Sequence, residues 1–271
     1  MILKTVLQHH TEVNMKRIAV ITGASSGLGK EYAKAVEKQL APDEIWLIAR
    51  RQQQLEETAA SLQGKGRVIP MDITRKEDMD AFTAMLDEEE VQIICLINAA
   101  GMGRIGSIAS QSRKDTVNMI QLNCTALAEM TNICIPCLIK GAWVLQIASI
   151  AGFQPMPYLG IYAATKSFVQ SYSKALHHEL KADGIHVTCV CPYWIKDTEF
   201  IGIASEESKD YAWMPLALKR SDVVNRSLAD VRVNRLMSTP GLISSTERYL
   251  SRIVPDTLTM KVLDRFRQIR K

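Results

Sequence analysis

Short apolar runs alternate with amphipathic stretches along most of the chain. Six runs have the length of buried strands, and they span residues 17–21, 44–49, 67–71, 91–97, 142–148 and 185–191. The stretches between them have the helical period, as in Leu28, Tyr32, Val36 and Leu40, which lie four residues apart on one face. Strands that alternate with helices of this length predict βαβ units and a mainly parallel sheet.

Parallel strands joined by helices restrict the layout of the sheet. Crossover connections are right-handed in nearly all proteins, so the pattern predicts a doubly wound α/β fold with helices on both faces. The six runs and a short apolar piece at 236–242 give about seven strands. Ligands of such sheets bind at the carboxyl ends of the strands, and the residues directly after each strand are therefore the candidates for function.

Residues 197–222 interrupt this alternation. They combine glycine, acidic residues, Trp213 and Met214 without a clean period, which favours a substrate lid. A helical pattern at 221–233 and two further helical patterns follow. Because no linker rich in Pro or Gly divides the chain, we expect an extension at 1–14 and one domain at 15–271. Its C-terminal helical elaboration would span 243–271.

Composition places the chain among globular proteins. Of its 271 residues, 47% are hydrophobic and 23% are charged, close to the globular average. No apolar run approaches the roughly 18–20 residues of a membrane span, and residues 1–14 lack the apolar stretch and cleavage site of a signal peptide. These features predict a cytoplasmic protein without a transmembrane segment.

The net charge of +4 lies in the last 15 residues. Residues 257–271 carry five basic residues and one Asp, so the rest of the chain is formally neutral. This distribution excludes the basic face of a nucleic-acid-binding domain. The tail has Val262, Leu263, Phe266 and Ile269 on one helix face. It either packs on the domain or a subunit, which we favour, or lies on a membrane surface.

The six cysteines predict reduced thiols. Cys134 and Cys137 have C-x-x-C spacing, but they end a helical pattern, where the helix dipole would not lower a thiol pKa. Cys189 and Cys191 alternate with valines in a strand-like run. The histidines have no metal-ligand spacing either, and we expect no metal.

A glycine-rich turn, TGASSGLG at residues 22–29, follows the first predicted strand. Glycine lets the backbone turn tightly and approach a phosphate, and the free N–H groups of the following helix attract the anion. The spacing is G-x-x-x-G-x-G, which matches neither G-x-G-x-x-G nor a P-loop. A purely structural turn is the weaker alternative in this strand–turn–helix context.

The second strand is followed by Arg50 and Arg51, which suit the 2′-phosphate of NADP, whereas an acidic residue would favour NAD. A solvated pair at a helix start is the alternative. Asp72, with Ile73, follows the third strand and would either accept a hydrogen bond from an adenine amino group or cap a helix. Asn98 ends the fourth strand and can brace its neighbours, and the small residues after it leave room for a cofactor.

A tyrosine and a lysine suggest proton transfer. Tyr162 and Lys166 lie four residues apart, on one helix face, and follow Ser149 at the end of the fifth strand. An ammonium group beside a phenol stabilises the phenolate, so we expect Lys166 to lower the pKa of Tyr162 from about 10. Tyr162 is thus a candidate general acid and base.

The chain resembles the short-chain dehydrogenase/reductase family over residues 16–198. The shared motifs are TGASSGLG at 22–29, NAAG at 98–101, Asn123, Ser149, the Tyr162–Lys166 pair, and Pro192 with Thr198. The resemblance implies a Rossmann-type fold and an NADP-dependent carbonyl reductase, similar to hydroxysteroid dehydrogenases.

The resemblance also implies residue roles. Tyr162 would be the catalytic acid and base, Ser149 would bind the substrate oxygen, Lys166 would bind the nicotinamide ribose and tune Tyr162, and Asn123 would hold a relay water. The implied cofactor-binding residues are Gly23, Ser25, Ser26, Gly27, Leu28, Gly29, Arg50, Arg51, Asp72, Ile73, Asn98, Ala99, Ala100, Gly101, Tyr162, Lys166, Pro192 and Thr198. Members commonly form homodimers or homotetramers through two helices, and Phe168, Tyr172 and Leu176 offer an apolar stripe for this.

The sequence departs from the family pattern at two places. Tyr193 stands where the family has Gly after Pro, and Ala99 stands where it has Asn. The residues expected at the substrate are Met102, Phe153, Met156, Tyr158, Tyr193, Trp194, Trp213 and Met214. Since none is charged, they predict a bulky, apolar ketone or alcohol, steroid-like or fatty. A non-catalytic NADP(H) sensor or scaffold is the alternative function, although a sensor needs no proton relay.

Overall fold

The computed structural model describes residues 15–198 and 217–268. Seven parallel strands form one sheet in the order β3-β2-β1-β4-β5-β6-β7. They are β1 (Arg17–Thr22), β2 (Glu44–Ala49), β3 (Gly66–Pro70), β4 (Gln92–Asn98), β5 (Leu138–Ile147), β6 (His186–Val190) and β7 (Met237–Ser238). The Rossmann-type doubly wound sheet predicted from the apolar runs is therefore confirmed, and it is parallel throughout.

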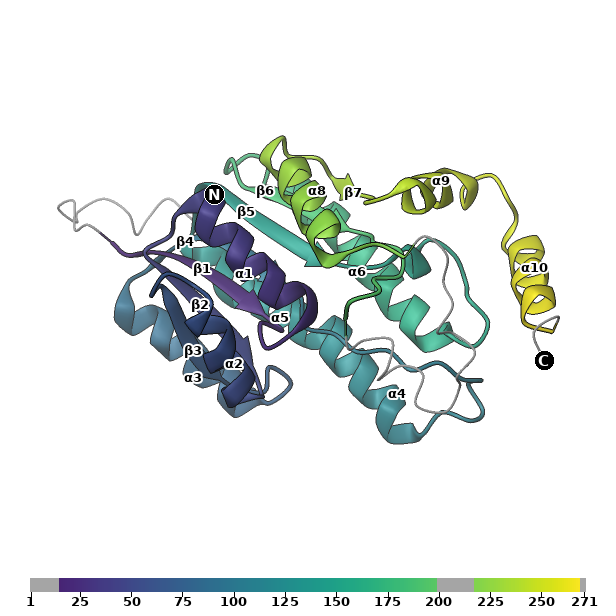
Figure 1. Ribbon diagram of the computed structural model, residues 1–271, viewed down its shortest axis with the longest axis horizontal. Helices are drawn as coiled ribbons and strands as arrows, with labels where there is room; N and C mark the ends of the chain where they lie inside the picture. Colours follow the sequence, from purple (N-terminus) through teal and green to yellow (C-terminus); the bar gives the residue numbers. More distant parts are fainter. Residues whose placement is uncertain (1–14, 199–216, 269–271) are drawn as a thin grey trace.

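Helices connect the strands and cover both faces of the sheet (Figure 1). The α-helices are α1 (Gly27–Leu40), α2 (Gln52–Ala60), α3 (Lys76–Glu89), α4 (Arg113–Ile120), α5 (Leu127–Cys134), α6 (Gly160–Glu179), α8 (Arg220–Arg232), α9 (Leu242–Leu250) and α10 (Asp256–Gln268). A π-helical turn, η1 (Gln121–Ala126), joins α4 to α5. Two 3-10 turns, η2 (Ile135–Cys137) and η3 (Ile150–Gly152), lie before and after β5.

Alternate side chains of each strand enter two separate cores. In β1, Ile18 and Val20 pack in one core with α3, α5 and α6, whereas Ala19 and Ile21 pack in the other with α1, α2 and α8. The period of two along a strand thus directs residues to opposite faces, and the helical period supplies the matching apolar stripe. Both faces are covered, which explains why the strands read as continuous apolar runs.

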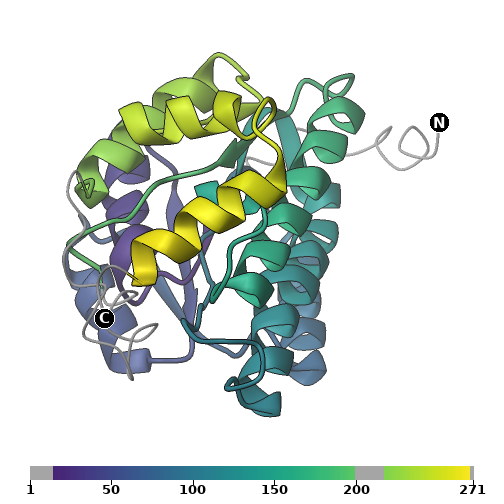
Figure 2. The same cartoon turned by 90° about the vertical axis from the view of Figure 1, so that its right-hand side faces the viewer.

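The strand order reverses direction between β1 and β4. The chain proceeds from β1 outward to β3, then returns to the other side of β1 with β4. At such a switch point the connecting helices leave on opposite faces, which opens a crevice at the carboxyl ends of the two strands. Helices α9 and α10 lie at this same end of the sheet (Figure 2).

β5 differs from the predicted strand at its start. It begins at Leu138, four residues before the predicted start, and its pairing with β4 shifts between Ile93 and Cys95. Lys140 and Gly141 interrupt the apolar run in this portion of the strand, and both are exposed. As predicted, Cys134 and Cys137 end a helix, in α5 and η2, and all six cysteines are free thiols.

The predicted lid falls largely outside the described residues. Its described ends are held together: Ile195 and Leu218 form a parallel bridge, and Arg220 Nε lies 3.2 Å from Asp197 Oδ2. In the C-terminal tail, Leu258 and Val262 on α10 are exposed. Within the described parts of the chain, no helix is both long enough and apolar enough to cross a membrane.

Candidate active site

A cavity of about 1640 Å³ opens at the carboxyl ends of the strands. Its wall contains the predicted glycine-rich turn, the two arginines after β2, the small residues after β4, and the Ser149, Tyr162 and Lys166 side chains. Of the predicted catalytic and cofactor-binding residues, only Asn98 and Asn123 are absent from the wall; both are buried. Residues more than 150 positions apart in the sequence thus line one cavity.

The glycine-rich turn is shaped by close backbone contacts. Gly23 has a φ of +70°, and a Cβ there would lie 2.7 Å from the backbone N of Ala100. A Cβ at Gly29 would overlap the carbonyl of Gly23. The turn is therefore pressed against both the start of α1 and the strand end that carries Ala100. At the start of α1, Ser26 makes no side-chain capping hydrogen bond, so the first N–H groups of the helix remain available to an anion.

The two arginines have different surroundings. Arg51 Nη2 donates hydrogen bonds to Ser25 Oγ at 3.2 Å and to Ser26 Oγ at 2.8 Å, which places its guanidinium group at the glycine-rich turn. The Arg50 side chain is largely exposed, and its Nη1 lies 3.9 Å from Asp72 Oδ2. Both arginines are nevertheless exposed, and Arg51 is the N-cap residue of α2, as the alternative of a solvated pair at a helix start predicts.

Asp72 lies beside the arginines at the end of β3. Its Oδ1 accepts hydrogen bonds from Thr74 N at 3.0 Å and from Thr74 Oγ1 at 2.7 Å. The carboxylate stabilises this turn, and α3 begins only at Lys76, with Arg75 as its N-cap. The alternative of a helix N-cap at Asp72 is thus wrong, because the N-cap residue is Arg75, three residues later.

Asn98 braces the strand ends as expected. Its amide donates hydrogen bonds to Gln146 Oε1 on β5 and to Thr131 Oγ1 on α5, each at 3.0 Å. Gln146 in turn donates to the same Thr131 hydroxyl at 3.0 Å. This buried triangle ties β4 to β5 and to the helix beneath them, next to the cavity wall.

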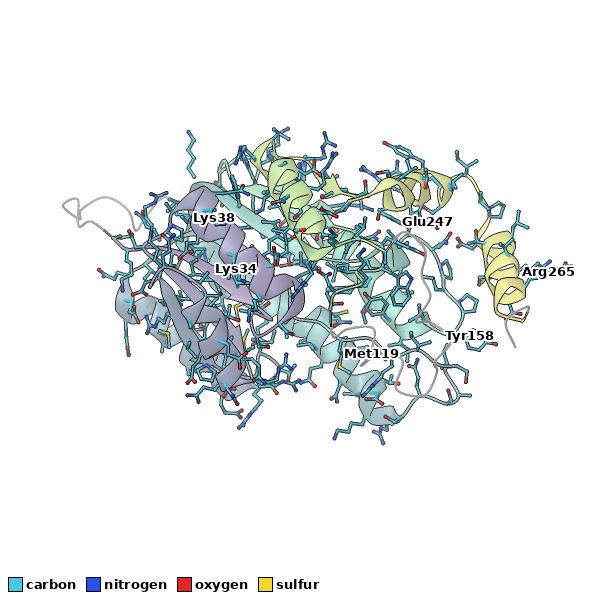
Figure 3. The ribbon with its side chains drawn as sticks, in the orientation of Figure 1. Lys34, Lys38, Met119, Tyr158, Glu247 and Arg265 are labelled. Carbon is cyan, nitrogen blue, oxygen red and sulfur yellow. The ribbon has the colours of Figure 1, made fainter. Side chains whose placement is uncertain are left out.

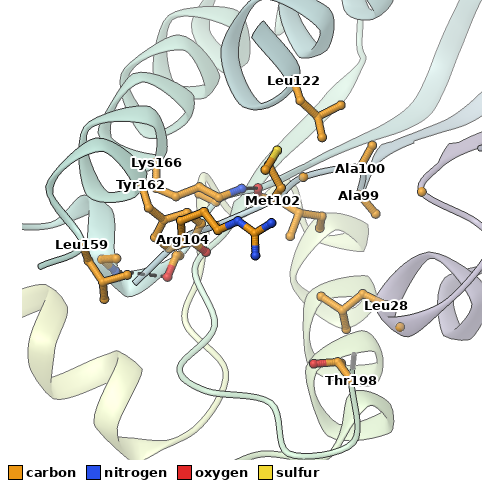
Figure 4. A pocket seen from close by; sticks show the side chains of 18 of the residues that line it. Leu28, Ala99, Ala100, Met102, Arg104, Leu122, Leu159, Tyr162, Lys166 and Thr198 are labelled. Atoms are coloured by element: carbon orange, nitrogen blue, oxygen red, sulfur yellow. Dashed lines mark hydrogen bonds between the residues drawn. The ribbon is translucent and has the colours of Figure 1, made fainter. Parts of the chain in front are cut away.

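Ser149, Tyr162 and Lys166 all line the cavity, and Figure 4 shows Tyr162 and Lys166 side by side on its wall. Ser149 follows β5 and accepts a hydrogen bond from Ala151 N at 3.2 Å, while the other two extend from α6. Lys166 Nζ lies 5.6 Å from the ring centroid of Tyr162 and donates to the carbonyl of Ile147 at 2.8 Å.

Burial controls the acidity of this pair. It raises the pKa of Tyr162 to about 12, although a hydrogen bond with Ser149 acts in the opposite direction. It also lowers the pKa of Lys166 to about 8, since no carboxylate compensates for the lost hydration of the ammonium group. The structure therefore contradicts the expected lowering of the Tyr162 pKa: desolvation of the phenolate outweighs the hydrogen bond with Ser149, and the pKa rises.

Asn123 holds the loop after β4 in place. It lies in the π-helical turn η1, where its Oδ1 accepts from Met102 N at 2.9 Å and its Nδ2 donates to Met102 O at 2.8 Å and to Thr165 Oγ1 at 3.0 Å. A Cβ at Gly101 would lie 3.2 Å from Asn123 Oδ1 and 3.5 Å from Lys166 Nζ. Gly101 thus leaves space where the polar ends of both side chains converge.

Pro192 and Thr198 also line the cavity, and Thr198 lies beside the glycine-rich turn. The Thr198 methyl group would lie 3.8 Å from a Cβ at Gly27, and Thr198 Oγ1 donates to Ile195 O at 3.2 Å. Figure 4 shows Thr198 and Leu28 on the same side of the cavity. Thr198 therefore lies beside the first turn of α1.

The substrate end of the cavity differs from the prediction. Met102, Met156, Tyr158, Tyr193 and Trp194 line it as expected. Phe153 instead packs against the core beneath η3, and Trp213 and Met214 lie outside the described residues.

Charged residues also line the cavity, in addition to the apolar residues named from the sequence. They are Arg104, Lys114, Asp115 and Glu247. Glu247 comes from α9 (Figure 3), four residues after Ile243, which lines the same wall. No signal in the local sequence identifies Glu247, because its position depends on how α9 packs beside η3. Arg104 follows the NAAG motif by only three residues and could have been found there.

The described residues contain no group of three or more His, Cys, Asp and Glu side chains that could hold a metal ion. The shape of the cavity fits a dinucleotide: two glycines bring the backbone close at one end, and the polar groups of Ser149, Tyr162 and Lys166 converge at the other.

Comparisons with known proteins agree with this geometry. The family model for short chain dehydrogenase matches residues 17–209. A very-long-chain 3-oxoacyl-CoA reductase of Macaca fascicularis is 30% identical over 247 residues, which cover 87% of this chain and 72% of the relative. A sulfoacetaldehyde reductase of Chromohalobacter salexigens is 35% identical over 186 residues, covering 66% of this chain and 72% of the relative.

Solved structures show the same fold. A short-chain dehydrogenase from Sphingobium yanoikuyae in complex with NADPH has a TM-score of 0.74 and 28% identity, with 89% of this chain and 97% of that chain covered. A short-chain dehydrogenase/reductase from Burkholderia phymatum in complex with NAD has a TM-score of 0.72 and 22% identity, with 86% and 92% covered. The chain therefore belongs to the short-chain dehydrogenase family and is an oxidoreductase of the type that binds a nicotinamide cofactor.

Proposed function

We propose that this protein is an NADP(H)-dependent carbonyl reductase that interconverts a ketone and a secondary alcohol with a bulky, mainly apolar body. The observation that carries the proposal is the convergence of Ser149, Tyr162 and Lys166 on one cavity that continues to the glycine-rich turn. The names of the relatives, which reduce 3-oxoacyl-CoA and sulfoacetaldehyde, support a carbonyl substrate.

The residues divide the reaction between them. A bound nicotinamide would supply or accept the hydride. Ser149 would donate a hydrogen bond to the substrate oxygen, and Tyr162 would deliver the proton to it. Because burial raises the pKa of Tyr162 to about 12, the phenol is protonated at neutral pH, as a proton donor in ketone reduction must be.

Lys166 and Asn123 would return the proton to Tyr162. The pKa of Lys166, lowered to about 8, lies near neutrality, so its Nζ can lose and regain a proton at little cost. Asn123 Oδ1 and Lys166 Nζ lie 3.2 and 3.5 Å from the position that a Cβ of Gly101 would take, and this convergence of two polar groups supports a water relay.

Arg51 supports NADP(H) over NAD(H). With the Ser25 and Ser26 hydroxyl groups it forms a cluster of hydrogen-bond donors at the turn where the adenosine ribose would lie. We propose that the other cofactor contacts come from the glycine-rich turn, from Asp72 and Ile73, and from the strand end 98–101. Pro192 and Thr198 would lie at the nicotinamide. We further propose a substrate lid at 197–222 and a cytoplasmic location, where the thiols would stay reduced.

Homo-oligomers would form through α5 and α6. Phe168 is 42% exposed and stacks in parallel on Tyr172, with 6.0 Å between the ring centroids. Leu176, in contrast, is buried in the core, so the interface would use only the first part of the predicted stripe. Light scattering tests this interface by comparing the mass of the Phe168→Glu variant with that of the unchanged protein. Equal masses would contradict the interface.

The experiment that tests the function follows NADPH oxidation at 340 nm across ketosteroids, 3-oxoacyl esters and aromatic ketones. Turnover of at least one class, lost in Tyr162→Phe, is expected. Tight NADPH binding without turnover of any carbonyl compound would instead favour the alternative of a non-catalytic sensor or scaffold. The intact set of proton-transfer residues argues against that alternative.

A further inference from the structure

The helix α9 carries its large apolar side chains on the outside. Leu242, Tyr249 and Leu250 stand at positions i, i+7 and i+8 and therefore share one face. They are 79%, 61% and 53% exposed, whereas Ser244 on the opposite face is fully buried. A helix that packs on a protein core normally has the reverse arrangement, with its polar face in water. The outer face of α9 thus has the composition of a contact surface.

The exposure of apolar residues continues beyond α9. Six of the eleven large apolar side chains that are exposed in the described residues lie between 242 and 262. These six, which we call the C-terminal apolar surface, are Leu242, Tyr249, Leu250, Ile253, Leu258 and Val262. Figure 1 shows α10, which carries the last two, at the outer edge of the molecule. Single exposed apolar residues are normal on a globular protein, but their concentration in one segment marks an interaction site.

Positive charge accompanies the C-terminal apolar surface. The net charge of +4 lies in residues 257–271, and the rest of the chain is formally neutral. Arg252, Lys261 and Arg265 are exposed and alternate with the apolar residues along the chain. Such a mixture suits the headgroup region of a bilayer, because apolar groups enter the acyl boundary while basic groups contact anionic headgroups.

A second copy of this chain fits the surface less well than a bilayer does. In a contact with twofold symmetry the same patch of both copies meets, which would bring the two basic segments together. Anionic headgroups supply the opposite charge instead. The charge of the segment therefore favours a lipid surface as its partner.

The position of α9 beside the cavity points in the same direction. The helix packs against η3, directly after Ser149, and its Ile243 and Glu247 line the cavity wall. One helix thus contacts the site on its inner side and carries apolar residues on its outer side. A fatty substrate partitions into a bilayer, so docking through α9 would hold the cavity next to its source. This last argument rests on the proposed function, whereas the exposure and the charge do not.

We propose that α9, the turn after it and α10 dock this protein on the surface of a membrane that contains anionic lipids. The C-terminal apolar surface would enter the interface between headgroups and acyl chains, and the basic residues around it would contact the headgroups. The protein would bind there peripherally and reversibly, as interfacial helices do.

Co-sedimentation with vesicles tests the proposal without cofactor or substrate. The full chain is mixed with vesicles of phosphatidylcholine alone, or of phosphatidylcholine and phosphatidylglycerol in equal parts. We expect binding to the anionic vesicles to be stronger by about tenfold or more at low salt, since each basic residue near an anionic surface contributes about fivefold. High salt should reduce this preference, because it screens the charges.

A double leucine variant tests the apolar contribution. Leu242→Gln combined with Leu250→Gln should weaken binding to the anionic vesicles by about tenfold or more, because it removes apolar area that would enter the interface. Val117→Gln combined with Val233→Gln is the matched control. Both valines are similarly exposed, but they lie on α4 and directly after α8. This control should bind vesicles like the unchanged protein.

A second pair of variants tests the charge separately. Lys261→Gln combined with Arg265→Gln should weaken binding to the anionic vesicles by about tenfold or more and leave binding to neutral vesicles unchanged. Lys38→Gln combined with Lys181→Gln is the control, because both lysines are exposed and lie outside the C-terminal segment. Figure 3 shows Lys38 and Arg265 at opposite ends of the molecule.

Three results would overturn the proposal: no preference of the unchanged protein for anionic vesicles, binding that survives the double leucine variant, or binding that survives Lys261→Gln with Arg265→Gln. A lower mass of the double leucine variant in light scattering, without vesicle binding by the unchanged protein, would assign the surface to a contact between two copies. Failure of the unchanged protein to bind NADP⁺ would instead contradict the proposed function, and the vesicle measurements would still decide the role of α9 and α10.

Discussion

Lys166 and Tyr162 lie one helical turn apart on α6, yet the lysine directs its hydrogen bond away from the phenol, to the carbonyl of Ile147 at 2.8 Å. Both side chains are buried, and burial favours the neutral form of each. The free protein thus holds a neutral phenol beside an amine that gives up its proton readily, and this pairing has measurable consequences.

Tyr162→Phe should abolish turnover and leave cofactor binding intact. The substitution keeps the ring and removes only the hydroxyl group, so kcat should fall by about 10²–10⁴-fold or more. NADPH affinity, measured by fluorescence titration, should stay within about twofold. Tyr172→Phe is the matched control, because Tyr172 lies on the same helix but does not line the cavity. Full activity of Tyr162→Phe would contradict the proton-transfer role.

Lys166→Met should stabilise the fold at neutral pH. The pKa of Lys166 is lowered from 10.5 to about 8, so between these pH values the unfolded chain holds a proton that the native protein has lost. Native stability contributed by this group therefore rises with pH over that range, and the buried charge costs up to about 3 kcal/mol below pH 8.

Urea unfolding at pH 7 and at pH 10 measures the effect of Lys166→Met. The methionine variant should be more stable than the unchanged protein at pH 7, and its advantage should shrink at pH 10. An advantage that is the same at both pH values would show that Lys166 is not desolvated in the native state.

Arg51→Ala should weaken NADP(H) binding and leave NAD(H) binding nearly unchanged. Loss of a charge-assisted contact to phosphate costs about 1.5–3 kcal/mol, or roughly ten- to a hundredfold in affinity. Arg75→Ala serves as the control, because Arg75 is exposed and lies outside the cavity. Equal affinities of the unchanged protein for the two cofactors would refute the assignment of Arg51 to a 2′-phosphate.

Gly23→Ala should damage both stability and cofactor binding. Gly23 and Gly64 have similar positive φ values, +70° and +79°, but only at Gly23 would a Cβ meet backbone atoms, the nearest at 2.7 Å. Gly64→Ala therefore measures the conformational cost alone, about 1 kcal/mol. Urea unfolding should show a clearly larger loss for Gly23→Ala. Equal losses would mean that the turn can move away from Ala100.

The sequence predicts most of the sheet because the inner strands β1, β2, β4 and β6 are buried along nearly their whole length and appear as mainly apolar runs. The start of β5 was missed, since Lys140 and Gly141 break the run where the strand reaches solvent. Ser149, Tyr162 and Lys166 could be found because their spacing reflects one strand end and one helix turn.

Other features depend on tertiary packing and could not be predicted. Glu247 reaches the cavity only through the placement of α9, and Phe153 leaves it because η3 turns the ring into the core. The pKa of Tyr162 depends on how completely its ring is buried, which spacing along a helix does not reveal.

The parallel bridge between Ile195 and Leu218 holds these two residues side by side. Lys196 N donates to Leu218 O at 3.1 Å, Leu218 N donates to Trp194 O at 2.8 Å, and Asp197 pairs with Arg220 beside them. Doubling the length of a connection between two fixed points costs only about 0.6 kcal/mol in chain entropy. The residues between these anchors can therefore be exchanged for longer or shorter sequences while the sheet keeps its pairing. Since the proposed lid lies between these anchors, the proposal implies that substrate preference could change at this position without a new fold.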